Sequence, residues 1–576
     1  MVAQAATAAN DLTKKLSNLD VSDWSQLEPI AQAFVDRPIE SPTGVEQWLL
    51  DLSAFSAAID EFGSRKYIDK SCHTDDPAIE KAYLHFVENI EPKLKPVFFE
   101  LQKKYLASPH RSKLTDARYD MLSRKWQADV DVFDPRNVPI ETEITKLVNE
   151  YDKISGAMTV EFEGKTLTLQ QLARYGEETD RDLRKRAYEV GTERRMNDAD
   201  KIEKLFDAIL PLREQVAQNA GVSDYRAFMW KALKRFDYTP EECHAYAKAV
   251  EETVVPVVKQ ADAQRKAALG VDALRPYDLA VDVKGRSPLR PFDEKDIDGF
   301  VTRTKEIFHR MSPALADDFE TLRTHGNLDL GSRLGKQPGG YQISLEQSKQ
   351  PFIFMNAAGL QRDVETLLHE GGHAFHFIAA SQFEPLTFLR SAPMEFCEVA
   401  SMSMEALASD HFDVFYKSRE EADRAKRTYF EGVIRILPWI AIIDQFQHWL
   451  YTHPKHSPAE RTAHWISLLD RFGGAVDHSG YEHIRATSWQ RQLHLFHCPF
   501  YYIEYGIAQL GALQLWLKAK EDPKRALGNY RNALRLGGTK PLPKLFEAAG
   551  LRFDFSRQTI EPLMNAIAEE LAALPA

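Results

Sequence analysis

The motif that most constrains this chain of 576 residues is His-Glu-Gly-Gly-His, which lies within the stretch Asp363–Ala380. His369 and His373 are four residues apart, so on a helix both imidazoles stand on one face and can reach one metal ion. Glu370 follows the first histidine, where its carboxylate can hydrogen-bond a metal-bound water without being a ligand. Apolar residues at three-and-four spacing precede the motif and favour a helix. H-E-x-x-H on a helix is typical of zinc peptidases. Because the chain has 18 histidines, such a match can arise by accident, and the interpretation depends on its surroundings.

A catalytic zinc site needs a third protein ligand and an open position for water. A third histidine at metzincin spacing would fall near residue 379, which is alanine, and this excludes that class. The remaining option is a glutamate on a following helix. Residues 391–409 are predicted to form that helix and offer Glu395, Glu398 and Glu405. Glu395 and Glu398 lie on adjacent turns of one face, so one can ligate the metal while the other orients a histidine N–H.

Composition and charge limit the classes of function. The net charge of −12 and the lack of a long basic run argue against a nucleic-acid-binding protein. The four cysteines lie far apart, which fits a reducing compartment and no disulfide framework. The first fifteen residues contain no apolar segment of signal-peptide length. The most hydrophobic stretch, 433–451, contains charged residues and a proline, which is typical of a buried helix rather than a membrane span. We therefore expect a cytoplasmic protein with no membrane partner.

The periodicity of the chain predicts a mainly α fold. Apolar residues recur at helical spacing through most of the sequence, and residues 158–169 alternate across Glu163-Gly164 as a β-hairpin does. No fixed-period repeat or low-complexity linker marks a boundary. We divide the chain into an N-terminal helical region, 1–190, which includes the hairpin, and a catalytic region, 191–576.

A small β-sheet is predicted just before the motif. Residues 341–345 and 352–355 are short apolar runs bounded by Gly, Pro and polar residues. A strand beside a metal helix can offer its free edge to an extended peptide, so that main-chain hydrogen bonds hold the substrate. We expect the substrate-binding residues Phe352, Phe354 and Asn356 on such an edge.

A second dense group of polar and aromatic residues lies at 491–516. In a zinc peptidase, a hydrogen-bond donor opposite the metal stabilises the tetrahedral oxyanion. Histidine N–H and tyrosine hydroxyl groups are suitable donors. The same residues are also typical of the start of a buried amphipathic helix, so composition alone leaves both interpretations open. The candidates are His494, His497, Tyr501, Tyr502 and Tyr505.

The segments HEGGHAFH and EFCEVASMSME together resemble the thimet oligopeptidase and oligoendopeptidase F family of zinc peptidases, and AQNAGVSDYRAF and KRFDYT resemble its oligoendopeptidase F branch. In that family the third ligand is a glutamate twenty-five residues after the second histidine, which corresponds to Glu398. Glu395 takes the supporting role by position. Members of the family carry a histidine and a tyrosine-rich segment that contact the substrate carbonyl. Here this pattern favours His494 and Tyr505, with Tyr502 next. The resemblance further implies two helical lobes that enclose a deep substrate channel.

The resulting prediction is a zinc metalloendopeptidase with one Zn²⁺ per chain, held by His369, His373 and Glu398. Glu370 is the expected general base in the hydrolysis of short oligopeptides. Two alternatives remain, a helical zinc carboxypeptidase and a non-catalytic peptide-binding protein on a peptidase scaffold. The sequence does not determine the oligomeric state, the cleavage preference or the function of residues 1–150.

Overall fold

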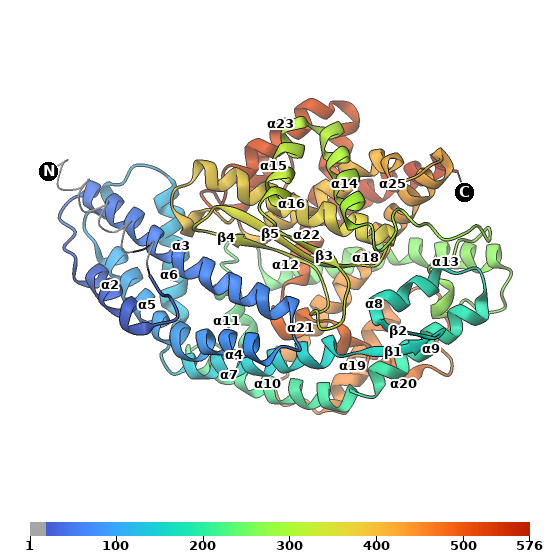
Figure 1. The fold of residues 1–576 in the computed structure, drawn as a ribbon, viewed down its shortest axis with the longest axis horizontal. Coiled ribbons are helices and arrows are strands. Elements are labelled where there is room, and N and C mark those ends of the chain that lie inside the picture. Colours follow the sequence, from blue (N-terminus) through green and yellow to red (C-terminus); the bar gives the residue numbers. More distant parts are fainter. Residues whose placement is uncertain (1–15, 17–18, 576) are drawn as a thin grey trace.

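The computed structural model describes residue 16 and residues 19–575. The first fifteen residues, where we looked for a signal peptide, lie outside this part. The described chain is mainly helical, with a hairpin and one small sheet (Figure 1). Its N-terminal helices are α2 (Trp24–Asp36), α3 (Pro42–Cys72), α4 (Pro77–His85), α5 (Glu91–Ala107), α6 (Arg118–Val132) and α7 (Asn137–Gly156). Side chains from residues 16–126 form a hydrophobic core of their own, closed by Leu386 and Leu389.

The hairpin predicted near 158–169 is present as β1 (Thr159–Phe162) paired antiparallel with β2 (Lys165–Thr168). Its turn residues, Glu163 and Gly164, have φ of 48° and 74°, the left-handed conformation that a tight two-residue hairpin turn requires. Further helices follow: α8 (Leu169–Leu172), α9 (Arg181–Met196), α10 (Ala199–Asn219), α11 (Tyr225–Ala232), α12 (Pro240–Thr253), α13 (Val255–Leu269), α14 (Ile297–Met311) and α15 (Pro313–Thr324).

The sheet has three strands in the order β3-β5-β4, so β5 is central and β4 lies at an edge. They are β3 (Leu328–Gly331), β4 (Tyr341–Leu345) and β5 (Gln350–Ala357). β5 pairs in parallel with β3 and antiparallel with β4. The sheet leads directly into α16 (Gln361–Phe383), which carries the histidine motif.

The C-terminal part is a bundle around α16. Its helices are α17 (Met394–Ala408), α18 (Arg419–Thr452), α19 (Pro458–Phe472), α20 (Glu482–Ala486), α21 (His494–His497), α22 (Tyr502–Glu521), α23 (Pro523–Leu534), α24 (Leu542–Ala548) and α25 (Arg557–Ala573). Several begin with a capping box, as Ser418 and Glu421 do at α18. No helix in the described part of the chain is long and apolar enough to cross a membrane.

One large hydrophobic core runs from Val132 to Ile567 and joins α7 and α10 to the C-terminal bundle. The two hydrophobic cores therefore divide near residue 130, and the boundary near residue 190 stays a prediction. In Figure 1 the sheet, α14–α16, α22, α23 and α25 form an upper lobe, and α4, α7, α10, α19 and α20 form a lower one. Three cavities of about 400, 550 and 400 Å³ adjoin one another, and the middle one is lined by residues of both lobes, such as Tyr151 of α7 and Arg362 of α16. They form the deep channel that we expected between two helical lobes.

At Gly372 the backbone of α16 packs directly against the backbone of α17. A Cβ built on Gly372 would lie 2.5 Å from the carbonyl oxygen of Ala400 and 2.5 Å from the Cα of Ser401. Both neighbours are helix backbone and cannot rotate away. The absence of a side chain at Gly372 thus sets the distance between the two helices, which explains a glycine in a helix interior that costs about 1 kcal/mol.

We expect Gly372→Ala to lower the free energy of unfolding by about 1–3 kcal/mol, because the added methyl forces the two helices apart. Denaturant unfolding followed by circular dichroism measures the change. Gly528→Ala is the matched control, because Gly528 is an exposed glycine of α23 with no neighbour within 4 Å of its Cβ position. That substitution should stabilise the protein by about 0.5–1 kcal/mol. Equal effects of the two substitutions would contradict this account of Gly372.

Candidate metal centre

Two imidazoles and one carboxylate meet where α16 crosses α17. The Nε2 atoms of His369 and His373 lie 3.3 and 3.5 Å from Oε2 of Glu398. The two histidine side chains are 17% and 14% exposed, whereas that of Glu398 is only 1% exposed, so the imidazoles face a cavity and the carboxylate lies behind them. The structure thus brings together the three residues that the sequence predicted as ligands.

The spacing of these donors fits a metal ion. Ligand atoms at about 2.0–2.1 Å from a tetrahedral zinc lie roughly 3.3–3.4 Å from one another, close to the two measured separations. Burial lowers the pKa of His369, but Glu398 and Glu405 raise it, and the net value is well above the ordinary one. The centre therefore attracts positive charge. Two nitrogens and one oxygen on one side of a cavity form a donor set with an open position.

His369 and Glu398 are each held by further hydrogen bonds. Nδ1 of His369 lies 2.6 Å from Oε1 of Glu405, and this contact leaves the Nε2 lone pair free to bind a cation. Glu398 accepts from the Ser401 hydroxyl at 2.8 Å and from the Tyr501 hydroxyl. Burial raises the pKa of Glu398, but His373 and His369 lower it well below its usual value, so the carboxylate is ionised.

Glu395 does not orient a histidine, contrary to our expectation. Its Oε1 accepts from the Tyr238 hydroxyl at 2.6 Å and lies 3.9 Å from Nε of Arg235. Glu405, two turns beyond Glu398 along α17, occupies the supporting position instead. Glu405 follows Glu398 by seven residues and so lies on nearly the same face of α17, whereas Glu395 is engaged by Tyr238 and Arg235.

Glu370 lies between the histidines and the edge strand. Its side chain is buried, lines the same cavity as the three donors and contacts the backbone of β4. Burial raises the pKa of Glu370, while the two histidines and the backbone N–H of Gln342 partly offset this effect. The carboxylate is thus placed beside the donor set without being part of it.

His494 and Tyr505 line the same cavity as the donor set, and the ring of Tyr505 lies 6.4 Å from that of His369. Nδ1 of His494 lies 2.8 Å from Nε2 of Gln492, and its Nε2 lies 3.2 Å from the Tyr505 hydroxyl oxygen. An amide nitrogen can only donate, so Nδ1 accepts and the ring proton resides on Nε2. The Tyr505 oxygen accepts this proton, and its own O–H is free to point elsewhere. Burial lowers the pKa of His494 to about 4, so the ring is neutral at pH 7.

Tyr502, which we expected near the oxyanion, lies in a different cavity, with Arg362, Trp439 and Arg491. Its neighbour Tyr501, which sequence reasoning left as an alternative, lines the metal cavity and donates to Glu398. The chain turns at Phe500, where φ is +67°, so successive tyrosines point in different directions.

The edge that we assigned to Phe352, Phe354 and Asn356 is not free, because β5 pairs on both sides. Phe352 and Phe354 belong to a small hydrophobic core, and Phe354 stacks on Tyr341 with centroids 4.8 Å apart. The Asn356 amide donates to the carbonyl oxygens of Gln337 and Gly339, both at 2.9 Å, and holds the loop before β4. Within the described chain β4 is an edge strand of the sheet, and residues 339–344 line the metal cavity.

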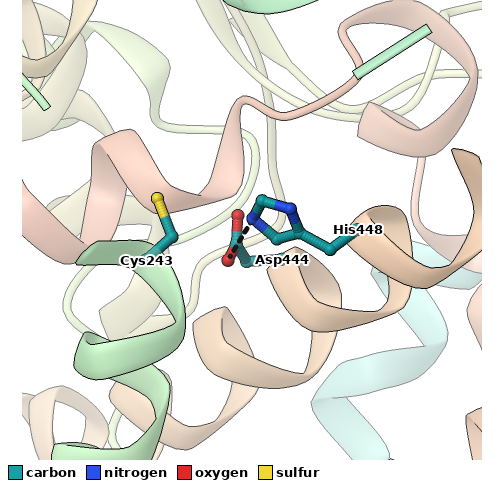
Figure 2. Close-up of side chains that lie close together, drawn as sticks. All are labelled: Cys243, Asp444 and His448. Carbon is teal, nitrogen blue, oxygen red and sulfur yellow. Dashed lines mark ion pairs between the residues drawn. The ribbon is translucent and has the colours of Figure 1, made fainter. Parts of the chain in front are cut away.

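A second group of possible donors lies elsewhere in the bundle. Cys243, Asp444 and His448 place their ligand atoms within 4.8 Å of one another (Figure 2). All three are buried, and the Asp444 carboxylate lies 3.3 Å from Nε2 of His448. Burial raises the pKa of the Cys243 thiol. None of the three residues lines the channel cavities, so this group has no access to a substrate.

The sequence analysis named two residues of the site only as candidates and did not assign their roles. Glu405 was one of three candidates, but nothing in its spacing assigned it to His369. Tyr501 was one of three tyrosines, and the choice depends on the turn at Phe500. The supporting network behind α17 also includes Arg235 and Glu504, whose Nη2 and Oε1 lie 2.9 Å apart.

Comparisons with known proteins agree with this arrangement. Residues 174–564 match the model of peptidase family M3, and residues 18–133 match the peptidase M3 N-terminal domain. The solved structure of PZ peptidase A with inhibitor 2 superposes with a TM-score of 0.91 at 27% identity, over 97% of this chain and 99% of that one. A solved putative oligoendopeptidase F gives a TM-score of 0.92 at 26% identity, also over 97% and 99%.

A curated relative is the oligoendopeptidase F homolog of Borreliella burgdorferi, 25% identical over 224 residues. That match spans 38% of this chain and 37% of the relative's length. The two family models together cover most of the described chain, including the metal helix, α17 and the tyrosine segment. The chain belongs to peptidase family M3.

Proposed function

We propose that the protein is a zinc-dependent endopeptidase that hydrolyses short oligopeptides. The observation that carries this proposal is the donor set itself. Two imidazole nitrogens and a carboxylate oxygen lie at the mutual spacing of zinc ligands and open onto a cavity that Glu370 also lines. A purely binding protein has no chemical need for a buried carboxylate beside three metal ligands.

His369, His373 and Glu398 would hold the ion, and Glu405 would orient His369. When bound, Zn²⁺ lowers the pKa of a coordinated water to about 7 and polarises the scissile carbonyl. Glu370 accepts the proton of the attacking water and returns it to the leaving amine. The partly apolar walls around Glu370 favour this exchange, because a buried carboxylate binds a proton more readily than an exposed one.

Tyr505 donates a hydrogen bond to the carbonyl oxygen as negative charge develops on it. Burial raises the pKa of its hydroxyl well above the usual value, so the proton is retained. His494 supports this role, because its Nε2–H donates to the Tyr505 oxygen and orients the hydroxyl. A donor aimed at the oxyanion in a site that excludes bulk water is worth several kcal/mol.

The substrate is proposed to extend along β4, whose outer edge is unpaired within the described chain. Backbone hydrogen bonds to an edge strand bind a peptide regardless of its side chains. The channel consists of cavities of about 400, 550 and 400 Å³, and spaces of this size suit short peptides, so oligopeptides are the proposed substrates. The four free cysteines support a reducing compartment, and we propose the cytoplasm.

Glu370→Gln tests the proposed function. We expect kcat for a quenched fluorescent peptide to fall by at least 10³-fold, because the amide cannot accept the water proton, while zinc content stays near one per chain. Addition of a chelator should abolish the wild-type activity, and zinc should restore it. Glu365→Gln is the control on the same helix, since burial raises the pKa of Glu365 to about 8 and the carboxyl is already neutral. Survival of activity in Glu370→Gln would refute the mechanism.

Tyr505→Phe tests the oxyanion donor. We expect kcat to fall about 10²-fold with little change in KM, because the hydroxyl acts only as charge develops. Tyr502→Phe is the comparison, because the sequence analysis ranked Tyr502 after Tyr505 as the oxyanion donor. We expect this substitution to lower kcat by at most a few-fold. A larger loss for Tyr502→Phe than for Tyr505→Phe would reverse the assignment.

Glu405→Gln tests the support of His369. Loss of such a supporting carboxylate typically weakens metal binding by 10–100-fold, and we expect this range in competition with a zinc-binding dye. Glu395→Gln provides the comparison. Because Glu395 contacts Tyr238 and Arg235, its substitution should lower thermal stability and leave the zinc affinity unchanged. Weaker zinc binding by Glu395→Gln, with unchanged zinc affinity of Glu405→Gln, would instead support the expectation that Glu395 orients a histidine.

A further inference from the structure

The cavity next to the metal cavity is lined by four arginines and by no carboxylate. We name it the arginine cavity; its volume is about 550 Å³, and its arginines are Arg195, Arg362, Arg435 and Arg491. Arg435 is neutralised by Asp262, with Nη2 2.6 Å from Oδ1. The chain as a whole carries a net charge of −12, so this local excess of positive charge is not a general property of its surface.

The other three arginines are not paired in this way within the described part of the chain. Among the described residues, no hydrogen bond or ion pair engages the guanidinium groups of Arg195, Arg362 and Arg491. Burial lowers the pKa of Arg195, and the charge of Arg491 lowers it further. Burial likewise lowers the pKa of Arg491, and Arg362 adds to that effect. The three groups are accessible to water inside the channel yet close enough to repel one another.

Such an arrangement favours the binding of an anion. Like charges repel one another, and none of the residues that line the arginine cavity is an acid. Guanidinium groups match a carboxylate in shape, because their paired N–H donors reach both oxygens at once. The side chains of Gln170, Gln492 and Tyr502 add further polar groups to the same walls.

The arginine cavity is continuous with the metal cavity. Pro338, Gly339 and Leu493 line both. Arg362 lies on α16 seven residues before His369, which is two turns of the same helix. The two residues therefore lie on nearly the same face, about 10 Å apart along the helix axis. An extended peptide advances about 3.3 Å per residue, so this distance corresponds to about three residues.

The direction of β4 determines which end of a peptide reaches the arginines. The strand runs from Tyr341 to Leu345, and the residues just before it, Pro338 and Gly339, border the arginine cavity. A peptide that pairs antiparallel with β4 runs in the opposite direction, as β5 does on the other side of the strand. Its C-terminal end then points toward Gly339 and the arginines.

We propose that Arg195, Arg362 and Arg491 bind the C-terminal carboxylate of the peptide substrate, about three residues beyond the scissile bond. This inference rests on the proposed endopeptidase function, whose substrate class it narrows to peptides with a free C-terminus near the cleaved bond. The positively charged N-terminus of a peptide would be repelled by the same groups. The cavity therefore also fixes the direction in which a substrate enters.

Binding to the full-length Glu370→Gln variant tests the proposal without requiring turnover. Fluorescence anisotropy is measured with three peptides that are labelled at the N-terminus and share one sequence up to their last residue. The first has a free C-terminal carboxylate, the second a C-terminal amide, and the third a C-terminal amide with glutamate as its last residue. We expect the free acid to bind at least tenfold more tightly than the simple amide. Equal affinities for these two would overturn the proposal.

The third peptide distinguishes a terminal carboxylate from one on a side chain. We expect it to bind more weakly than the free acid, because its carboxylate extends beyond the main-chain position. Tighter binding of this peptide than of the free acid would overturn the assignment to the C-terminus.

Arg362→Gln and Arg195→Gln, combined in the Glu370→Gln background, should reduce the preference for the free acid to less than about threefold. Affinity for the amide should not change. Arg186→Gln is the matched control on α9, because Arg186 is exposed, pairs with Glu163 on the hairpin and does not line the channel. A preference that survives the double substitution would refute the assignment of these arginines.

Turnover by the otherwise unmodified protein separates this proposal from the proposed function. Chelator-sensitive cleavage of acid and amide with equal kcat/KM would retain the endopeptidase and reject the carboxylate site. Absence of any cleavage, with preferential binding of the free acid, would reject the endopeptidase and retain the carboxylate site.

Discussion

The close crossing of α16 and α17 is the constraint on which the site depends. A helix interior normally keeps its neighbours at a distance set by side chains, but Gly372 has none, and the backbone of α17 fills the space at Ala400 and Ser401. Glu398 lies one turn earlier on α17, so its carboxylate comes to within 3.3–3.5 Å of both imidazoles. The same crossing places Glu405 against the far nitrogen of His369.

A buried charge network supports α17 from its other side. Arg235 contacts Glu504 on α22 and lies near Glu395, which also accepts from Tyr238. Burial of so many charges is unfavourable unless each is paired, and pairing across three segments ties them together in one arrangement. The network therefore holds α17 and α22 in place, and these two helices carry Glu398 and Tyr505.

Charge is divided along the channel. The metal cavity is lined by Glu346, which pairs with Arg390, and by the carboxylates of Glu370 and Glu398, whereas no carboxylate lines the adjoining arginine cavity. The metal cavity therefore favours a cation and the arginine cavity favours an anion, at positions about two helical turns apart. A peptide carries its carboxylate at one end only, so this division gives the channel a direction that the shape of its walls alone would not provide.

The sequence by itself determined the features that depend on local spacing. Two histidines four residues apart must share a helix face, alternation across Glu163-Gly164 must form a hairpin, and the likeness of the 395–405 segment to a known family identified Glu398. It did not determine which strand lies at the edge, because β4 and β5 are both short and apolar and their order depends on β3. Nor did it assign Glu405 to His369, since that contact depends on the crossing angle of two helices.

The choice among the three tyrosines was likewise decided by tertiary structure. Phe500 adopts a φ of +67°, and its backbone is held by Gln447 of α18 and by Arg235. This turn directs Tyr501 toward the metal cavity and Tyr502 toward the arginine cavity. The groups that hold it come from parts of the chain far apart in sequence. Local spacing therefore contains no signal for it, because the strained backbone is stabilised only when the distant elements have packed together.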